Sequence, residues 1–157
     1  RGVAQLKGGA HPVGASVGKA VAQEEELGLD KAETLRGLAR KIDGIKSELG
    51  EILRDLKAEG KSIAGFGAPA KATTLMYHFG IGSDLIDFIV DDSPLKQGLF
   101  TPGMHIPVVG SAAIVDKKPD ALVILAWNFA KPIMEKHEAF RRAGGQFIIP
   151  LPKVEIL

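Results

Sequence analysis

Residues 63–71 read Ile63-Ala-Gly-Phe-Gly-Ala-Pro-Ala-Lys71, a short apolar run that leads through a glycine-rich turn into a helical stretch. Gly65 and Gly67 can adopt backbone angles that other residues avoid, and they let a ligand approach the main chain. The free N–H groups that start the helix after Pro69 favour an anion in this turn, most naturally a phosphate or diphosphate. The pattern G-x-G-x-x-A is a relaxed dinucleotide fingerprint, a weak signal that depends on its context.

The sequence after Gly60 alternates short apolar runs with helical stretches, which is typical of a parallel sheet flanked by helices. The fold class predicted is α/β, a Rossmann-like, five-stranded, mostly parallel sheet preceded by a long N-terminal helical extension. The expected strands are residues 62–66, 85–90, 105–109, 121–126 and 146–149. The expected helices are residues 70–79, 111–116 and 129–143.

The N-terminal part divides into three predicted pieces. Residues 2–6 look like a strand, and because the chain begins at Arg1 we expect a piece of a longer polypeptide. The glycine-rich residues 7–18 read as a linker, so residues 1–18 are assigned to the end of a preceding domain and a linker. Residues 19–59 form the helical extension, with Asp30 as the expected cap of its second helix. Residues 60–157 form the Rossmann-like domain.

The second helix of the extension carries apolar residues at alternating spacings of three and four, which form a narrow seam on one face. The seam favours either a coiled-coil dimer or a helix packed on its own or a neighbouring domain. Three glycines in this helix favour packing, because each weakens a free-standing helix by about 1 kcal/mol relative to alanine. The seam residues are Leu35, Leu38, Ile42, Ile45, Leu49, Ile52 and Leu56.

The composition excludes several classes of function. The net charge is +1, from 20 basic and 19 acidic residues spread along the chain, so no basic stripe for a nucleic acid is present. There are no cysteines, which removes disulfides and thiolate chemistry and fits a cytoplasmic protein. No apolar run approaches the roughly 18–20 residues needed to cross a membrane. We expect neither nucleic acid nor membrane as a partner.

Three strand ends are expected to face one crevice, because ligands in such sheets collect at the carboxyl ends of the strands. Asp91 follows the second strand, where an acid holds a ribose or sugar hydroxyl in dinucleotide folds; its alternative role is to cap the Ser93-Pro94 turn. Lys71 lies in the first helical turn, where the helix dipole disfavours a cation, so we expect it to meet a ligand phosphate; the alternative is a solvated lysine. Thr73 is expected to add a hydroxyl donor, with plain packing against the sheet as the alternative.

A long loop and an aromatic residue complete the predicted site. Lys96 and Gln97 lie in the loop from Asp91 to Met104, which is longer than a connection requires. Trp127, the only tryptophan, can stack on a base or sugar beside the amide of Asn128; equally, it can fill the end of the sheet. The substrate-binding residues predicted are Gly65, Gly67, Ala68, Pro69, Ala70, Lys71, Thr73, Asp91, Lys96, Gln97, Trp127 and Asn128.

No catalytic or metal site is predicted. The four histidines show no paired spacing with carboxylates that would suit a metal, and no triad or carboxylate pair is evident. The usual S-adenosylmethionine site has an acid just before a more glycine-rich turn, whereas Ile63-Ala64 precede Gly65 here. The chain therefore reads as a binding domain without a bound cofactor.

Several linked motifs together resemble the C-terminal domain of the S-adenosylmethionine-dependent sugar C-methyltransferase family, and the resemblance covers nearly the whole chain. Departures occur at Tyr77, Ala72 and Leu99-Phe100, where the family commonly has asparagine, glycine and a basic-aromatic pair, and they bear on which sugar is accepted. The motifs are Gly65-Phe-Gly-Ala-Pro-Ala-Lys71, Gly80-Ile-Gly82, Asp84-Leu-Ile-Asp-Phe-Ile-Val-Asp91, Pro94-Leu-Lys-Gln-Gly98, Pro102-Gly-Met-His-Ile-Pro107 and Leu125-Ala-Trp-Asn128, with Gln5-Leu-Lys-Gly-Gly9 near the start.

The resemblance implies a domain that binds a nucleoside-diphosphate sugar, with thymidine diphosphate as the expected carrier. Zinc, S-adenosylmethionine and the acid/base residues would belong to upstream zinc-binding and methyltransferase domains, the second of which is the expected partner. An isolated domain is then not expected to be active alone. Two alternatives remain open: an NAD-dependent oxidoreductase or NAD sensor, supported by the same fingerprint and Asp91, and a dimerisation or docking module built on the seam.

Overall fold

The computed structural model describes residues 4–157, which divide between two units, Arg1–Ile42 and Asp43–Leu157. The first unit holds α1 (Ala15–Glu26), which has no buried side chain, and the start of α2 (Ala32–Ala58). Residues 4–6 are not in a strand; the rest of the strand expected at residues 2–6 lies outside the described residues. Asp30 does not hold the expected capping position, because α2 begins at Ala32.

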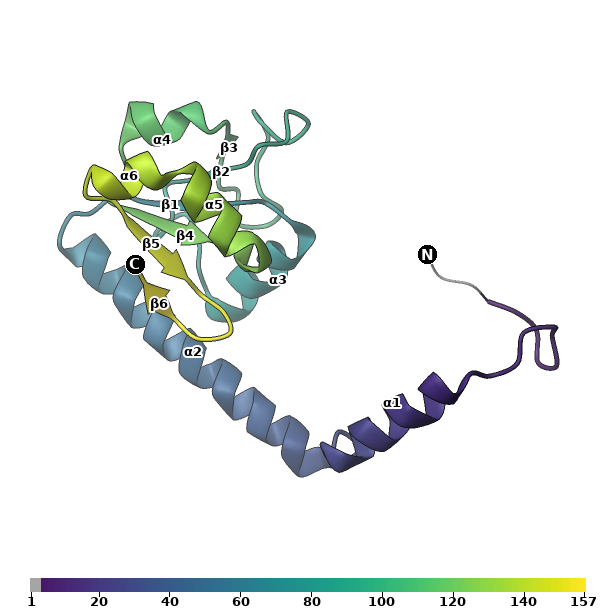
Figure 1. The fold of residues 1–157 in the computed structure, drawn as a ribbon. Coiled ribbons are helices and arrows are strands. Elements are labelled where there is room, and N and C mark those ends of the chain that lie inside the picture. Colours follow the sequence, from purple (N-terminus) through teal and green to yellow (C-terminus); the bar gives the residue numbers. More distant parts are fainter. Residues whose placement is uncertain (1–3) are drawn as a thin grey trace. The chain divides into compact units, whose positions relative to one another are not determined.

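The second unit is built on a six-stranded sheet with the order β3-β2-β1-β4-β5-β6 (Figure 1). The first five strands are parallel, and β6 pairs antiparallel with β5. The predicted α/β class with a mostly parallel sheet is confirmed, and the count of five strands is corrected to six. The strands are β1 (Ile63–Phe66), β2 (Phe88–Val90), β3 (Val108–Val109), β4 (Ala121–Ile124), β5 (Gln146–Ile149) and β6 (Glu155–Ile156).

After α2, helices follow β1, β3 and β4, whereas no helix separates β2 from β3 or β5 from β6. The helix predicted at residues 129–143 is interrupted at His137, whose backbone angles (φ −110°, ψ 28°) are not helical, so it forms two helices instead of one. The helix predicted at residues 70–79 is confirmed, and Gly80 ends it in the left-handed conformation (φ 69°). These helices are α3 (Ala70–Phe79), α4 (Ala112–Lys117), the 3-10 helix η1 (Trp127–Phe129), α5 (Ala130–Lys136) and α6 (Glu138–Arg142).

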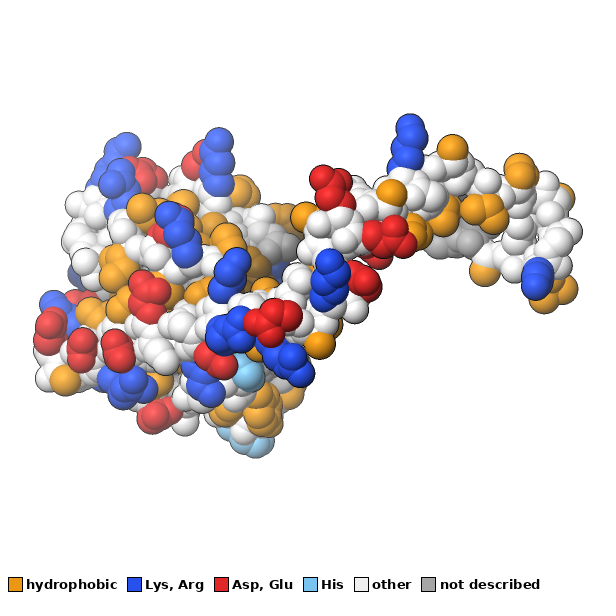
Figure 2. Space-filling model, turned by 90° about the horizontal axis from the view of Figure 1, so that it is seen from below, with side chains coloured by type: hydrophobic (Ala, Val, Ile, Leu, Met, Phe, Trp, Pro, Cys, Tyr) orange, Lys and Arg blue, Asp and Glu red, His pale blue; other side chains and the backbone are white. Residues whose placement is uncertain are grey.

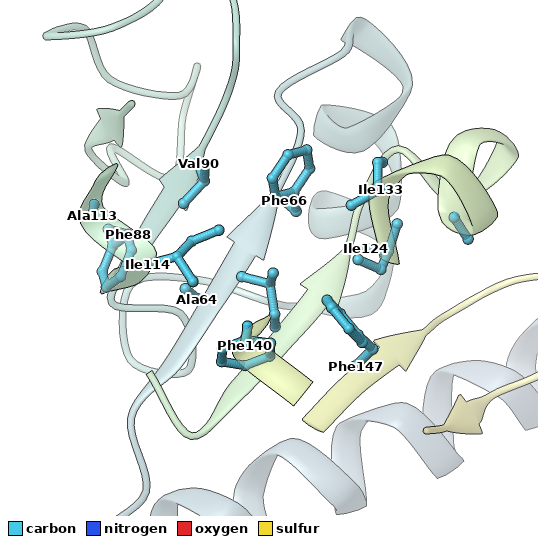
Figure 3. Close-up of a cluster of buried hydrophobic side chains, with 12 residues drawn as sticks. Ala64, Phe66, Phe88, Val90, Ala113, Ile114, Ile124, Ile133, Phe140 and Phe147 are labelled. Carbon is cyan, nitrogen blue, oxygen red and sulfur yellow. The ribbon is translucent and has the colours of Figure 1, made fainter. Parts of the chain in front are cut away.

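One face of the sheet packs against α4, α5 and α6, which Figure 1 shows on the same side. Side chains alternate along a strand, so Ala64 and Phe66 of β1 point to this face together with Phe88 and Val90 of β2. Figure 3 shows Ile114 of α4 beside Phe88, while Phe140 of α6 stacks edge-on against Phe147 of β5, with ring centroids 5.2 Å apart. The helices thereby fix the sheet whose strand ends carry the predicted site.

The C-terminal half of α2 belongs to the core of the second unit. Leu49 and Leu53 are fully buried. Lys57 near the end of α2 binds Asp87 (Nζ to Oδ1, 2.7 Å), and Asp87 Oδ2 accepts the amide N–H of Ile63 at the start of β1. The helix is therefore tied to the amino ends of the strands, at the opposite edge of the sheet from the predicted site.

Surface charge is mixed in sign. Figure 2 shows acidic and basic side chains interspersed with hydrophobic ones on the face that it draws. Of the helices in residues 4–157, none has both the length and the apolar character that a membrane crossing requires.

Candidate functional site

The glycine turn after β1 is held tightly against the end of β4. Gly67 has a positive φ (90°), and its amide donates to the carbonyl oxygen of Val90 at 2.7 Å. A Cβ on Gly67 would lie 2.6 Å from the Cβ of Ala126, and one on Gly65 would lie 2.8 Å from Leu125. Both glycines are thus required by close packing and, at Gly67, by backbone conformation.

Asp91 closes the turn from inside the protein. Its Oδ2 accepts the amide N–H of Ala68 at 2.7 Å and the ammonium of Lys96 at 3.0 Å, while Oδ1 accepts the amide of Ser93 at 2.9 Å. Burial alone would raise the pKa of Asp91, but these hydrogen bonds from Ala68, Ser93 and Lys96 outweigh it and lower the pKa below 3.8. Asp91 therefore carries a charge into the turn where an external anion was expected.

Asp91 takes one of the two roles weighed for it from the sequence, and the other, contact with a ligand hydroxyl, stays a prediction. It caps the turn at Ser93, as the alternative reading had it, and it lies at the strand end beside the glycine turn. Its side chain is only 11% exposed. Three hydrogen bonds and this burial leave little access for a ligand hydroxyl, so the carboxylate first of all positions its neighbours.

Lys71 and Trp127 come together from α3 and η1. The Lys71 ammonium lies over the indole ring, 3.9 Å from its centroid, a cation–π contact. Both side chains are partly buried, whereas Asn128 next to the tryptophan is exposed. Two of the three predicted strand ends, those of β1 and β4, thus meet through side chains as expected.

Lys96 and Gln97 lie in the loop after β2 and both bind Asp91, which is joined to the glycine turn. Gln97 donates from Nε2 to the carbonyl oxygen of Asp91 at 3.0 Å, and it packs against Gly110, where an added Cβ would lie 3.2 Å from Oε1. The ammonium of Lys96 binds the carboxylate of Asp91, and the Lys96 side chain also lines the cavity described next. Lys96 therefore lines the cavity, whereas Gln97 is linked to the site only through its hydrogen bond to Asp91.

A cavity of about 240 Å³ opens beside the turn, between α3 and the loop after β2. It contains four predicted residues, Ala68, Pro69, Thr73 and Lys96. The loop wall is fixed by Thr101, whose hydroxyl oxygen accepts the amide N–H of Ile106 at 3.0 Å. Ala72, Leu99 and Phe100, noted above only as departures from the family pattern, also line it. The lining residues that sequence reasoning missed are Met76, Thr101, Pro102 and Val108.

A signal for part of this wall exists in the sequence. Pro69, Ala72, Thr73 and Met76 are spaced by three and four, which places them on one face of α3. No comparable spacing marks the loop residues, because their contribution depends on how residues 98–107 fold back on β3.

Asp92 turns away from this cavity. Its carboxylate binds the hydroxyl of Ser111 and the ammonium of Lys136, which lie on the α4 and α5 side of the sheet. The hydrogen bond from Lys136 is the largest cause of its lowered pKa. Asp91 and Asp92 thus serve opposite faces of the sheet.

A second, larger cavity of about 650 Å³ lies between α4 and α6 and contains none of the predicted site residues. His137 lines it, and its Nε2 is buried without a hydrogen-bond partner among the described residues. The imidazole packs against Phe66, with ring centroids 5.0 Å apart, and burial lowers its pKa. Within residues 4–157 no three histidine, aspartate or glutamate side chains are grouped to hold a metal ion.

Comparison with known proteins identifies the family. The model of the C-methyltransferase C-terminal domain matches residues 1–152. The C-methyltransferase NovU of Streptomyces niveus is 33% identical over 147 residues, which cover 94% of this chain and 35% of that protein. The chain thus spans about a third of the length of this relative. Because the family model matches nearly the whole chain and this relative is 33% identical over 94% of it, the chain belongs to the C-methyltransferase C-terminal domain family.

Proposed function

We propose that this chain is the substrate-binding domain of a sugar C-methyltransferase and holds a nucleoside-diphosphate sugar, with thymidine diphosphate as the carrier. Methyl transfer is assigned to an S-adenosylmethionine-dependent domain elsewhere in the protein. The observation that carries the proposal is the convergence, at one edge of the sheet, of the glycine turn, the cation of Lys71 and a cavity bordered by Lys96.

The turn suggests where the diphosphate sits. Ala68 already donates its amide to Asp91, and Pro69 has no N–H, so the free amides at the start of α3 are those of Ala70 and Lys71. The side chain of Lys71 extends from the same turn and supplies a full charge. We place the phosphates at these groups and outside the space taken by Asp91.

The cavity beside the turn suits one ring of the ligand. Its volume of about 240 Å³ is below the roughly 300–1,000 Å³ of pockets that enclose whole drug-sized ligands. Its walls are largely apolar, and its polar side chains are Thr73, Lys96 and Thr101. A base or a deoxysugar has an apolar face that can pack against such walls. It also has oxygens that can accept hydrogen bonds from the Thr73 hydroxyl and the Lys96 ammonium.

Neither of the cofactors that the family implies fits the described residues. Zinc would need three or four histidine, cysteine or carboxylate ligands, and residues 4–157 offer no such group. S-adenosylmethionine would need a free acid for its ribose, but Asp91 is committed to Ala68, Ser93 and Lys96. We therefore assign both cofactors to other parts of the protein.

The rival proposal, an NAD-dependent oxidoreductase or NAD sensor, needs the same turn to hold a pyrophosphate. The carboxylate of Asp91, which accepts the Ala68 amide at 2.7 Å, repels the pyrophosphate of NAD and the diphosphate of a nucleotide sugar alike, so it does not separate the two proposals. The match to a C-methyltransferase family favours the sugar substrate.

Ligand-observed NMR on the 157-residue chain tests the proposal with thymidine diphosphate, a thymidine-diphosphate sugar, NAD and S-adenosylmethionine in parallel. Selective signals from the two thymidine compounds are expected, and selective binding of NAD would establish the rival. K71A should weaken binding about tenfold or more, since one hydrogen bond between charged groups contributes about 1.5–3 kcal/mol. K117A is the control, because Lys117 lies over Phe88, on α4.

A further inference from the structure

We infer that Lys71 and Trp127 form an exchange pair: Lys71 covers the indole in the free protein, and a ligand phosphate draws the ammonium away and opens that indole face to the ligand. This inference rests on the proposed function and goes beyond it, because it assigns a coupled movement to two binding residues. The sequence predicts that these two residues, 56 positions apart, face one crevice, and the contact at 3.9 Å shows that they meet directly.

The tryptophan side of the pair is held in place. Ala126, the residue before Trp127, donates its amide to the carbonyl oxygen of Phe66 at 3.1 Å, and its Cβ fills the space beside Gly67. The start of η1 is therefore fixed against the glycine turn. A lysine side chain, in contrast, has a flexible four-carbon stem, so the ammonium is the partner that can move.

A phosphate would bind the Lys71 ammonium more strongly than the indole ring does. Lys71 lies in the first turn of α3, where the helix dipole disfavours a positive charge. Among residues 4–157, the acidic side chains near the site pair with other lysines, Asp91 with Lys96 and Asp92 with Lys136, and Lys71 takes part in no salt bridge. A phosphate offers it a charge-assisted hydrogen bond, which is stronger than an interaction with an aromatic face.

The exchange links phosphate binding to ring stacking. While the ammonium lies over the indole, a base or sugar cannot stack on that face. Once the phosphate has drawn the ammonium away, the face becomes available a short distance from the phosphate. A nucleotide sugar offers both a phosphate for Lys71 and a ring that can stack on Trp127, whereas inorganic phosphate offers only the first.

Fluorescence tests this directly, because Trp127 is the only tryptophan in the chain. The emission of the wild-type chain is recorded during titration with inorganic pyrophosphate, which has no ring, and with thymidine diphosphate; isothermal calorimetry measures binding of thymidine diphosphate independently. The variant K71M keeps the length of the side chain without its charge. K117M is the matched control, since it removes another lysine that lies over an aromatic ring, at 5.3 Å from Phe88.

We expect both ligands to change the emission of the wild type and of K117M. K71M should start from an altered emission, should not respond to pyrophosphate, and should bind thymidine diphosphate about tenfold more weakly. Thermal unfolding at the wild-type temperature would show that K71M is folded. Calorimetric binding of thymidine diphosphate with unchanged wild-type emission would overturn the exchange and leave the proposed function standing. The absence of both heat and emission change would overturn the two together.

Discussion

The carboxylate of Asp91 accepts the amide N–H of Ala68 at 2.7 Å, which joins the end of β2 to the glycine turn after β1. The anion that this turn attracts is thus supplied in part by the protein itself. Lys96 and Ser93 complete the shell of donors around the carboxylate. A ligand at this edge of the sheet therefore meets a turn that is already ordered.

Replacing Asp91 by asparagine should destabilise the domain. The variant D91N keeps the shape of the side chain but loses its charge, and one amide oxygen cannot accept all three hydrogen bonds of the carboxylate. We expect the free energy of unfolding to fall by about 1.5–3 kcal/mol, the contribution of hydrogen bonds to a charged group. Urea unfolding followed by circular dichroism measures this change. D116N is the control, because Asp116 is exposed and its loss should have an effect below about 0.5 kcal/mol.

The same carboxylate predicts a dependence of stability on pH. The pKa of folded Asp91 lies below its ordinary value of 3.8, so the contribution of the carboxylate is complete above that value. It is lost as the pH falls through the lowered folded pKa. The difference in stability between wild type and D91N should therefore be constant near neutral pH and should shrink in acid. A difference that grows in acid would contradict the assignment.

Gly67 should tolerate no side chain. The variant G67A meets two penalties, since a left-handed residue costs about 1–2 kcal/mol and overpacking against Ala126 costs about 1–3 kcal/mol more. Gly60 has a similar φ (76°) with nothing within 4 Å of the position of a Cβ, so G60A should pay the first cost alone. Chemical unfolding of the two variants separates the cost of the left-handed backbone from the cost of overpacking. Equal losses of stability in G67A and G60A would show that Ala126 can shift to accommodate the added Cβ.

The sequence predicted the elements whose signals are local. The helix at residues 70–79 ends at Gly80, which must be left-handed, and the strand at residues 146–149 follows the glycine pair that ends the last helix. The interruption at His137 has no such signal, because neither proline nor glycine marks it. β6 has only two residues, too few for a pattern, and exists because it pairs with β5.

The candidate site was predictable only in part for a similar reason. Strand order brings the ends of β1, β2 and β4 to one edge, so the positions of Lys71, Asp91 and Trp127 follow from topology. The hydrogen-bond and contact partners of a side chain do not follow from topology. That Asp91 binds Ala68, and that Lys71 lies on Trp127, depends on distances set by the packed turn.

The apolar seam of α2 divides into a buried and an exposed half, which gives another prediction. Leu49 is fully buried, so L49A should cost about 2–5 kcal/mol of unfolding free energy. Leu38 is 55% exposed, and L38A should cost less than about 1 kcal/mol in a monomer. Sedimentation at several concentrations is the companion measurement. A dimer that dissociates in L38A would assign the exposed half to a subunit interface and support the dimer alternative.

The cavity beside the turn can be closed from its loop wall without touching the turn. Leu99 lines the cavity and is partly exposed, so L99W adds an indole where we place a ring of the ligand. Affinity for a thymidine-diphosphate sugar should fall about tenfold or more, as expected when about 1.4 kcal/mol of binding free energy is lost. Leu95 lies in the same loop, is 86% exposed and does not line the cavity, so L95W is the matched control. Calorimetry on both variants measures the affinity. Weaker binding in L99W alone would place the ring of the ligand in this cavity. Unchanged binding in L99W would contradict that placement and assign the ring to the Trp127 side of the turn.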